Sequence, residues 1–280
     1  MATTIANLGS PAPSGNLLIV DGLNVAFRWK HQNILDFKYD YIRTIESLAK
    51  SYNAGTIIVC ADGGSSYRKE IYPEYKANRK ERFADQTEQE AKEFEMFMAE
   101  FSDTLTLIRK KYPVFHFRGV EADDIAAYIT QKINYDECWL ISSDKDWDLL
   151  ISDTVSRFST VTRKETTVHN WDEHYDFEIE DYITFKCLTG DKGDNVPGVP
   201  GVGPKRAVQL LNQYGSVFDI YDACPLDGKY KYIQSVNENA EQLLTNVELM
   251  DLLAYCDDAI GEHNRKIIDD TLEGILNDKN

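Results

Sequence analysis

The sequence predicts an α/β protein built on a central, mainly parallel sheet. Five short apolar runs recur in the first 160 residues, and longer amphipathic segments separate them. The runs are LLIV (17–20), TIIVCA (56–61), VFHF (114–117), CWLIS (138–142) and VSRFS (155–159). Such runs fit strands buried on both faces, and parallel strands need helix-length crossovers. Beyond about Thr184 the strand signals end and the chain is predicted to be helical, with one helix at about 238–253.

The connections between the runs predict helices. A helical stretch follows the first run and extends to about Tyr52. In the longest connection Thr87 and Glu90 form a capping box that starts a helix, and Pro113 stops it. One face of this helix carries an apolar stripe, which we assign to core packing. The stripe consists of Phe94, Phe97, Met98, Phe101, Leu105 and Ile108.

Composition suggests a tail of residues 1–16, rich in Gly, Pro, Ser and Thr, before an α/β body (17–184) and a smaller helical region (185–280). The net charge of −17 means that nucleic acid would have to bind through local basic patches. No apolar stretch is long enough for a membrane span or a signal peptide. Five cysteines without a CxxC pair argue for reduced core thiols in the cytoplasm, and against a structural zinc site.

Acidic residues follow four of the apolar runs directly or within a few positions. They are Asp21, Asp62, Glu121, Asp123, Asp124, Asp144 and Asp146. The carboxyl ends of parallel strands meet at one edge of a sheet, where ligands bind, so these seven carboxylates should converge. Two more, Asp191 and Asp194, open a Gly-rich segment three residues apart and would share one side of a helical turn.

Each of these acids alone could be a helix cap or a turn former. Their conjunction argues against that interpretation, because folding does not require nine carboxylates at one edge. Carboxylates packed this closely repel one another unless a cation joins them. An all-oxygen ligand set favours Mg²⁺ or Mn²⁺ over zinc, and nine ligands exceed the needs of one ion. We therefore expect two divalent ions, the arrangement used for in-line displacement at phosphorus.

Two segments could supply positive charge to a polyanion. Residues 67–82, YRKEIYPEYKANRKER, hold six Lys or Arg against three Glu, with three tyrosines interleaved, directly after Asp62. A solvated charged helix is the plain alternative, but metal-bound phosphate needs cationic help and unpaired bases stack on tyrosines. The second segment, GVPGVGPKRA (198–207), places glycines before a helix that would offer free N–H groups to a phosphate. Binding would then follow backbone and shape rather than base sequence.

Five motifs, in this order, resemble the structure-specific 5′ nucleases, also called flap endonucleases. They are IVDGLN, PEYKANR, RGVEADDIAA, SSDKDWD and GDKGDNVPGVPGVGPKRA. The chain is most similar to the bacteriophage 5′-exonucleases and to the 5′-nuclease domain of bacterial DNA polymerase I, over about residues 16–260. The resemblance implies a PIN-like 5′-nuclease core, a helical arch at about 66–105 and a helix-three-turn-helix motif at about 187–214.

The resemblance also implies roles for individual residues. The first metal site would comprise Asp21, Asp62, Glu121, Asp123 and Asp124, and the second Asp144, Asp146, Asp191 and Asp194. Asp21, Asp144, Lys76 and Arg79 would be catalytic, the last two reaching the scissile phosphate from the arch. DNA would contact Arg28, Lys30, Tyr75, Lys76, Arg79, Lys80, Gly201, Gly203, Lys205 and Arg206. A potassium ion would sit on backbone carbonyls of the helix-three-turn-helix. Which of Asp123 and Asp124 is the direct ligand stays open.

The expected activity is Mg²⁺-dependent 5′-3′ exonuclease and flap endonuclease cleavage of DNA, serving phage DNA replication or primer removal. Substrates would be DNA with 5′ flaps, 5′ overhangs or branched ends, cut by a free-standing monomer in the cytoplasm, away from membranes. No clamp-binding tail is evident in the terminal LEGILNDKN, so a sliding-clamp partner is not expected. Two alternatives remain: a PIN-like ribonuclease for single-stranded RNA, and a non-catalytic DNA junction-binding protein.

Overall fold

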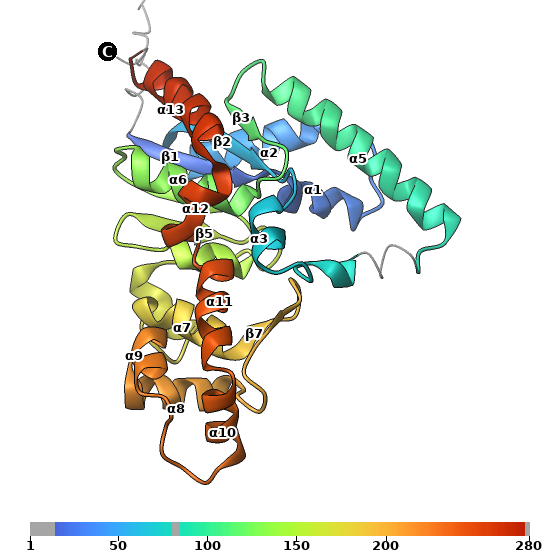
Figure 1. Ribbon diagram of the computed structural model, residues 1–280. Coiled ribbons are helices and arrows are strands. Elements are labelled where there is room, and N and C mark those ends of the chain that lie inside the picture. Colours follow the sequence, from blue (N-terminus) through green and yellow to red (C-terminus); the bar gives the residue numbers. More distant parts are fainter. Residues whose placement is uncertain (1–14, 80–84, 278–280) are drawn as a thin grey trace, which may run out of the picture.

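The computed structural model describes residues 15–79 and 85–277, and its six-stranded sheet carries the upper part of the molecule in Figure 1. The strands are β1 (Asn16–Asp21), β2 (Ala54–Ala61), β3 (Val114–His116), β4 (Cys138–Ile141), β5 (Val155–Phe158) and β6 (Glu165–Thr166). The first five match the five predicted runs, and the sequence missed β6. Residues 1–14 of the predicted tail lie outside the described residues, whereas Asn16, which was assigned to that tail, begins β1.

The sheet order is β3-β2-β1-β4-β5-β6, with β6 antiparallel and the other pairs parallel. In β1, Ile19 pairs with Ile58 of β2 on one side and with Leu140 of β4 on the other. The chain order reverses between β1 and β4, and such a switch point opens a crevice at the carboxyl ends of the strands. The fold therefore delivers the residues that follow β1, β2 and β4 to one edge.

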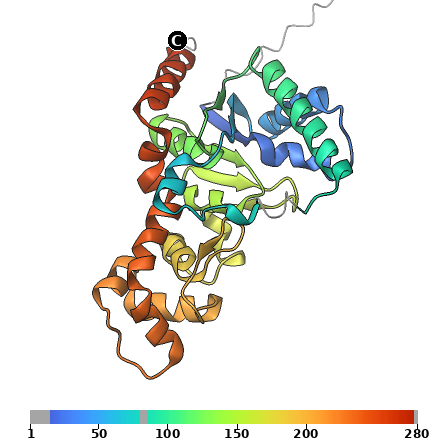
Figure 2. The same ribbon diagram turned by 45° about the vertical axis from the view of Figure 1, so that its right-hand side comes forward.

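Helices cover both faces of the sheet (Figure 2). One face packs against α1 (Gly22–Lys30), α2 (Lys38–Ser51) and α5 (Glu88–Ile108), and the other against α6 (Ala122–Lys132), α12 (Leu252–Ile260) and α13 (Glu262–Asn277). Short helices α3 (Ser66–Ile71), η1 (Lys145–Leu150), η2 (Val168–Glu173) and η3 (Ile179–Asp181) complete this part. The predicted stretch to Tyr52 is thus two helices, α1 and α2. The predicted fold class is confirmed.

Helix α5 is the long helix at the right of Figure 1, in the segment predicted to form an arch. Its capping box is present, because Thr87 accepts from the Glu90 backbone N–H and Glu90 accepts from the Thr87 backbone N–H. Phe97, Phe101 and Ile108 of its apolar stripe are buried against the sheet, which confirms their assignment to core packing. The residues between Arg79 and Asp85, including Lys80, lie outside the described part of the chain.

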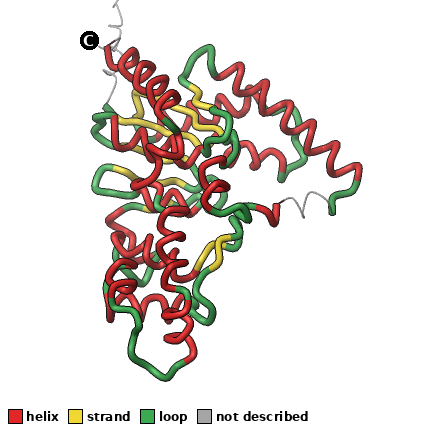
Figure 3. The backbone as a smooth tube through the Cα atoms, in the orientation of Figure 1, coloured by secondary structure: helices red, strands yellow, loops and turns green. Residues whose placement is uncertain are grey.

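The lower region in Figure 3 is helical, as predicted, except for one short strand pair. Its helices are α7 (Tyr182–Thr189), α8 (Pro204–Tyr214), α9 (Val217–Asp222), α10 (Lys231–Glu238) and α11 (Ala240–Met250). The expectation that strands end at Thr184 was wrong, because β7 (Gly190–Asp191) pairs with β8 (Val196–Pro197). The last helices also leave this region: Leu252, Cys256 and Ile268 of α12 and α13 join the core beside α6.

Candidate active site

The end of β1 contributes a buried aspartate. Asp21 is 5% exposed and caps α1, accepting from the Asn24 backbone N–H at 3.2 Å. Its other oxygen accepts from the Ser142 hydroxyl at 2.6 Å, and that hydroxyl also accepts from the Asp144 backbone N–H at 3.1 Å. Ser142, which the sequence did not single out, therefore ties the ends of β1 and β4 together.

The end of β2 meets the start of α6. Asp62 accepts from the Ala122 backbone N–H at 2.9 Å, which places it beside Glu121 and Asp123. Asp123 accepts from the indole N–H of Trp147 at 2.6 Å. Because Trp147 is fully buried in η1, this bond fixes the first acid of α6 against the segment that carries Asp144 and Asp146.

A buried arginine distinguishes Asp124 from its neighbour. Arg68 of α3 is 3% exposed and donates to both carboxylate oxygens of Asp124, at 2.7 and 2.8 Å. It also donates to Glu121 at 2.8 Å and to the Leu249 carbonyl at 2.7 Å. Asp123, by contrast, lines a small cavity together with Asp146, Asp191 and Asp194. The geometry thus favours Asp123 over Asp124 as the acid open to a ligand.

A cation that the sequence analysis did not single out contacts Asp146 and Asp191. Lys186 of α7 is 6% exposed, and its ammonium contacts Asp146 and lies 3.3 Å from an oxygen of Asp191. The only sequence signal was a lysine inside the apolar run YITFKCL. Asp191 and Asp194 do not share a helical turn as expected. Asp191 ends β7 and accepts from the Asp194 backbone N–H at 3.1 Å.

Asp194 contacts Lys76 and Arg79, two cations of the segment predicted to form the arch. Lys76 lies 3.4 Å from one carboxylate oxygen, and Arg79 donates to the other at 2.7 Å. Lys76 also contacts Glu121. The Tyr75 hydroxyl donates to Asp194 at 2.7 Å, and the residue is only 4% exposed. The structure contradicts the expectation that a base stacks on Tyr75. The Tyr75 ring is buried, and its hydroxyl orients the Asp194 carboxylate instead.

The electrostatics divide the acids into two kinds. Burial raises the pKa of Asp21, and the charges of Asp62 and Asp144 raise it further. Burial together with Asp62 and Asp144 likewise raises the pKa of Asp123. Burial outweighs the effect of Lys186 at Asp146 and raises its pKa to about 6. These mutual effects link acids from position 21 to position 191, in agreement with the one cavity that Asp123, Asp146, Asp191 and Asp194 line.

Glu121 and Asp194 are of the second kind. Burial acts to raise the pKa of Glu121, but Arg68 and Lys76 outweigh burial and lower it. Burial likewise opposes Lys76, Tyr75 and Arg79 at Asp194, where the pKa is also lowered. Glu121 and Asp194 therefore remain ionised at neutral pH because cations already compensate them.

The donor set fits a hard divalent ion. The clustered acids offer carboxylate oxygens, and the raised pKa values of Asp21 and Asp123 show that added positive charge would stabilise their ionised forms. Within residues 15–79 and 85–277, no three acidic, histidine or cysteine side chains already surround a common point. Lysine and arginine nitrogens instead occupy oxygens of Glu121, Asp146 and Asp194. Binding an ion would require these contacts to rearrange.

Two predicted DNA contacts lie on α1. Arg28 is exposed, and its guanidinium lies 5.8 Å from the centre of the Trp29 ring. It lines an open groove that also contains Arg43 and Arg163. The ammonium of Lys30 lies 5.1 Å from the centre of the Phe94 ring on α5. Neither residue joins the carboxylate edge.

The predicted glycine turn precedes α8 in the lower region. Gly201 has φ +79°, which favours glycine, and Pro204 is the first residue of α8 after Gly203. Lys205 is exposed, whereas Arg206 donates to the Gly201 carbonyl at 2.6 Å and lies 4.8 Å from the Tyr232 ring centre. Lys205 is thus free to meet a ligand, while Arg206 also shapes the turn.

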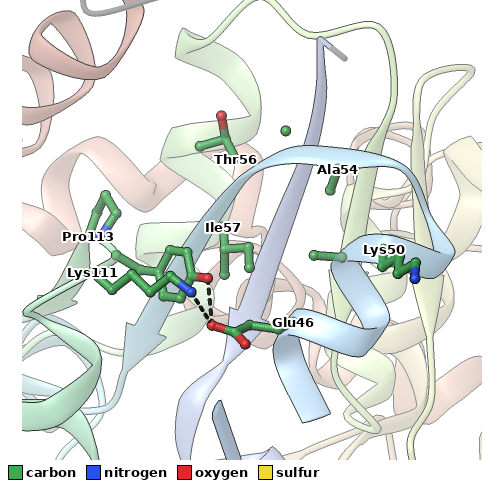
Figure 4. Close-up of a pocket in the computed structure, with 10 residues that line it drawn as sticks. Glu46, Lys50, Ala54, Thr56, Ile57, Lys111 and Pro113 are labelled. Carbon is green, nitrogen blue, oxygen red and sulfur yellow. Dashed lines mark hydrogen bonds and ion pairs between the residues drawn. The ribbon is translucent and has the colours of Figure 1, made fainter. Parts of the chain in front are cut away.

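A larger pocket lies away from these acids (Figure 4). Residues from α2, β2 and the segment before β3 line this cavity of about 570 Å³. Its single acid, Glu46, accepts hydrogen bonds from Lys111 and from the Tyr112 hydroxyl. The pocket therefore lacks the acid cluster that the chemistry requires.

Two family models together match most of the chain. Residues 16–176 match the N-terminal resolvase-like domain of 5′-3′ exonucleases, and residues 177–265 match their C-terminal SAM fold. The chain therefore belongs to the 5′-3′ exonuclease family and is a nuclease enzyme.

Relatives place the chain within this family. It is 47% identical over 266 residues to the flap endonuclease of Escherichia phage T5, covering 93% of this chain and 91% of the phage protein. It is 31% identical over 216 residues to the thermostable DNA polymerase I of Thermus aquaticus, covering 73% of this chain but 25% of the polymerase. A solved structure of the T5 5′-exonuclease with bound zinc has 46% identity and a TM-score of 0.89, covering 95% of this chain and all of that one.

Proposed function

We propose that the chain is a Mg²⁺-dependent, structure-specific 5′ nuclease that hydrolyses DNA phosphodiesters at 5′ flaps, 5′ overhangs and branched ends. The observation that carries the proposal is the gathering of acids from four strand ends beside Lys76 and Arg79. The name of the T5 relative, a flap endonuclease, supports the same substrate class.

The clustered acids would form two sets of metal ligands. Two divalent ions, when bound, supply Lewis-acid stabilisation of the attacking and leaving oxygens of an in-line displacement. Asp21, Asp62, Glu121 and Asp123 would hold the first ion, and Asp144, Asp146, Asp191 and Asp194 the second. Mn²⁺ would substitute, since it shares the preference for oxygen ligands. The zinc in the T5 structure supports a divalent site.

Lys76 and Arg79 would bind the phosphate. Both side chains now contact Asp194, and an incoming phosphate would compete with that carboxylate for them. A phosphate oxygen that develops charge in the transition state is stabilised by fixed cations. Asp124 would act indirectly, by anchoring Arg68 beneath Glu121.

DNA would also bind at a distance from the acids. Gly201, Gly203, Lys205 and Arg206 would contact the duplex backbone at the start of α8, with a potassium ion on neighbouring carbonyls. Arg28, Lys30 and Lys80 would contact the strand near the active site.

We further propose that the protein acts as a monomer in the cytoplasm during phage DNA replication or primer removal. All five cysteines are unpaired, which supports a reducing compartment. The described residues contain no helix able to cross a membrane.

The decisive experiment compares three substrates under identical conditions. A 5′-flap DNA, a blunt DNA duplex and a plain RNA strand are incubated with the protein in Mg²⁺, Mn²⁺ or excess chelator. The proposal predicts metal-dependent cleavage of the flap near its junction and little cleavage of the RNA. Cleavage of RNA alone would favour a single-strand ribonuclease. Flap binding without turnover in either metal would favour a junction-binding protein.

A further inference from the structure

An arginine outside the carboxylate cluster holds the segment that carries Asp144 and Asp146. This segment, from Ser142 to Asp148, follows β4 and includes the first part of η1. Arg157 of β5 is 5% exposed, and Asp148 is 1% exposed. Asp148 is the last residue of the SSDKDWD motif, but the sequence assigned no role to it or to Arg157, and neither belongs to the proposed metal ligands.

The Arg157 guanidinium bridges the two ends of the segment. One nitrogen, Nη1, donates to the Ser142 carbonyl at 3.1 Å. Two others, Nε and Nη2, donate to the two carboxylate oxygens of Asp148, and Nη2 also lies 3.2 Å from the Thr166 hydroxyl of β6. The planar fork of arginine suits this geometry, whereas the single ammonium of lysine cannot reach both ends in the same way.

Two tyrosines complete the network. The Tyr175 hydroxyl donates to Asp148, and the Tyr182 hydroxyl donates to the Lys145 carbonyl at 3.1 Å. Lys145 lies between Asp144 and Asp146 in the sequence. The segment is therefore fixed at its start, its middle and its end by side chains from β5, from the loop after η2 and from α7.

A buried ion pair is weak evidence for added stability, because desolvation offsets much of the attraction between the charges. A pair that bridges both ends of a ligand-bearing segment has a clearer consequence for geometry. Partners that orient metal ligands change metal affinity or activity about 10- to 100-fold when they are removed.

We propose that Arg157 is a positioning residue that fixes Asp144 and Asp146 for divalent-ion binding, with Asp148 and Tyr182 as its supports. The inference rests on the proposed function of these two acids. It adds a determinant of metal affinity that itself touches neither ion nor DNA.

The test uses the variants Arg157→Met and Tyr182→Phe of the full chain. Binding of Mn²⁺ to the DNA-free protein is followed by electron paramagnetic resonance of the free ion, and the Mg²⁺ midpoint of flap cleavage is measured separately. Arg157→Met should weaken one class of Mn²⁺ site by about 10- to 100-fold and raise the Mg²⁺ midpoint in parallel, with cleavage partly rescued at high Mg²⁺. Tyr182→Phe should show a smaller shift in the same direction. Flap binding in chelator should stay unchanged.

The matched control is Arg265→Met, which removes an arginine that pairs with Asp257 at 2.8 Å on α12 and α13. It should leave both metal measurements unchanged. If circular dichroism shows that Arg157→Met does not fold, Arg157→Lys takes its place, and several-fold weaker Mn²⁺ binding is expected. A folded Arg157 variant with wild-type Mn²⁺ affinity overturns the inference, even where the wild type cleaves flaps. A wild type without metal-dependent cleavage overturns the proposed function instead.

Discussion

Two groups of acids at the same sheet edge differ in how their negative charge is compensated, and their pKa values shift in opposite directions. The paired group, Glu121 and Asp194, is held by Arg68, Lys76 and Arg79, and its pKa values are lowered. The uncompensated group comprises Asp21, Asp62 and Asp123. Burial and repulsion by neighbouring acids raise its pKa values, although Lys76 and Arg79 act against this at Asp62. The hydrogen-bond donors to this group are neutral.

The difference separates two tasks within one site. Cations of the chain already balance the paired group in the metal-free protein, so Glu121 and Asp194 keep Lys76 and Arg79 beside the site, although both acids are also proposed metal ligands. The uncompensated group gains most from an added divalent cation, because such a cation relieves repulsion among buried charges. Changes at Asp144, Lys76 and Asp123 test this division, and a change at Lys205 tests a region outside both groups.

Asp144→Asn should have the largest effect. Asp144 adds to the charge felt by both Asp21 and Asp123, and it is a proposed ligand of the second ion. Losing a ligand that supports several kcal/mol of charge stabilisation should lower the single-turnover rate by at least about 10³-fold. Flap binding should be retained, or become tighter because less negative charge faces the phosphate. The measurement is quench-flow cleavage beside fluorescence anisotropy, and a parallel loss of both would contradict the assignment.

Lys76→Ala tests the paired group. The change removes the ammonium that contacts Glu121 and lies 3.4 Å from Asp194, while Arg68 and Arg79 still hold these acids. The single-turnover rate should fall by roughly 10²-fold, as for other single charge-stabilising groups. The Mg²⁺ midpoint should change much less than the rate. A wild-type rate at saturating enzyme would remove Lys76 from the catalytic residues. The exposed Lys110 provides a matched alanine control with no expected effect.

The sheet and the gathering of the acids could be predicted because both follow from local pattern. Apolar runs define buried strands, and the parallel arrangement then brings the residues after each strand to one edge. Strands β6, β7 and β8 could not be predicted, because a two-residue strand is too short to show a periodic hydrophobic pattern. The packing of α12 and α13 against the sheet also could not be predicted, because an apolar helix face does not reveal which surface it covers.

The partners of each acid could not be predicted from spacing. Arg68 lies within a charged segment whose lysines and arginines look alike in sequence. Arg68 is nevertheless buried, whereas Lys76 is partly exposed and Arg79 is exposed. Lys186 lies in an apolar run, and only the fold shows that its ammonium reaches Asp146 and Asp191. Tyr75 was expected to face DNA because it is aromatic beside lysines. Its burial follows from the packing of α3 against the lower region.

Lys205→Ala probes a region outside both groups and should have a moderate effect on binding alone. Lys205 is exposed at the start of α8, next to Gly203. Removing one phosphate contact should weaken flap binding and reduce the slope of log K against log salt by about 0.9. The rate at saturating DNA and the Mg²⁺ midpoint should not change. Binding titrations at four salt concentrations measure the slope, and an unchanged slope would show that Lys205 does not meet a phosphate.

The smallest change that we expect is in the stability of the metal-free protein, which Asp123→Asn should raise by ~1 kcal/mol near pH 8. Burial and the neighbouring acids raise the folded-state pKa of Asp123, so its stabilising contribution is present at low pH and is lost as pH rises through that pKa. The asparagine carries no charge and can still accept from Trp147. The difference in unfolding free energy between variant and wild type should therefore grow as pH rises from about 4 to 8.

Urea unfolding in chelator at several pH values measures this difference, and Asp153→Asn, at an exposed site between η1 and β5, is the control. Added Mg²⁺ should reverse the order, because an ion that binds only the folded protein stabilises the wild type more. A variant that is less stable than the wild type at pH 8 without metal would show that the charge on Asp123 is already balanced. The distinction between the two groups of acids would then not hold.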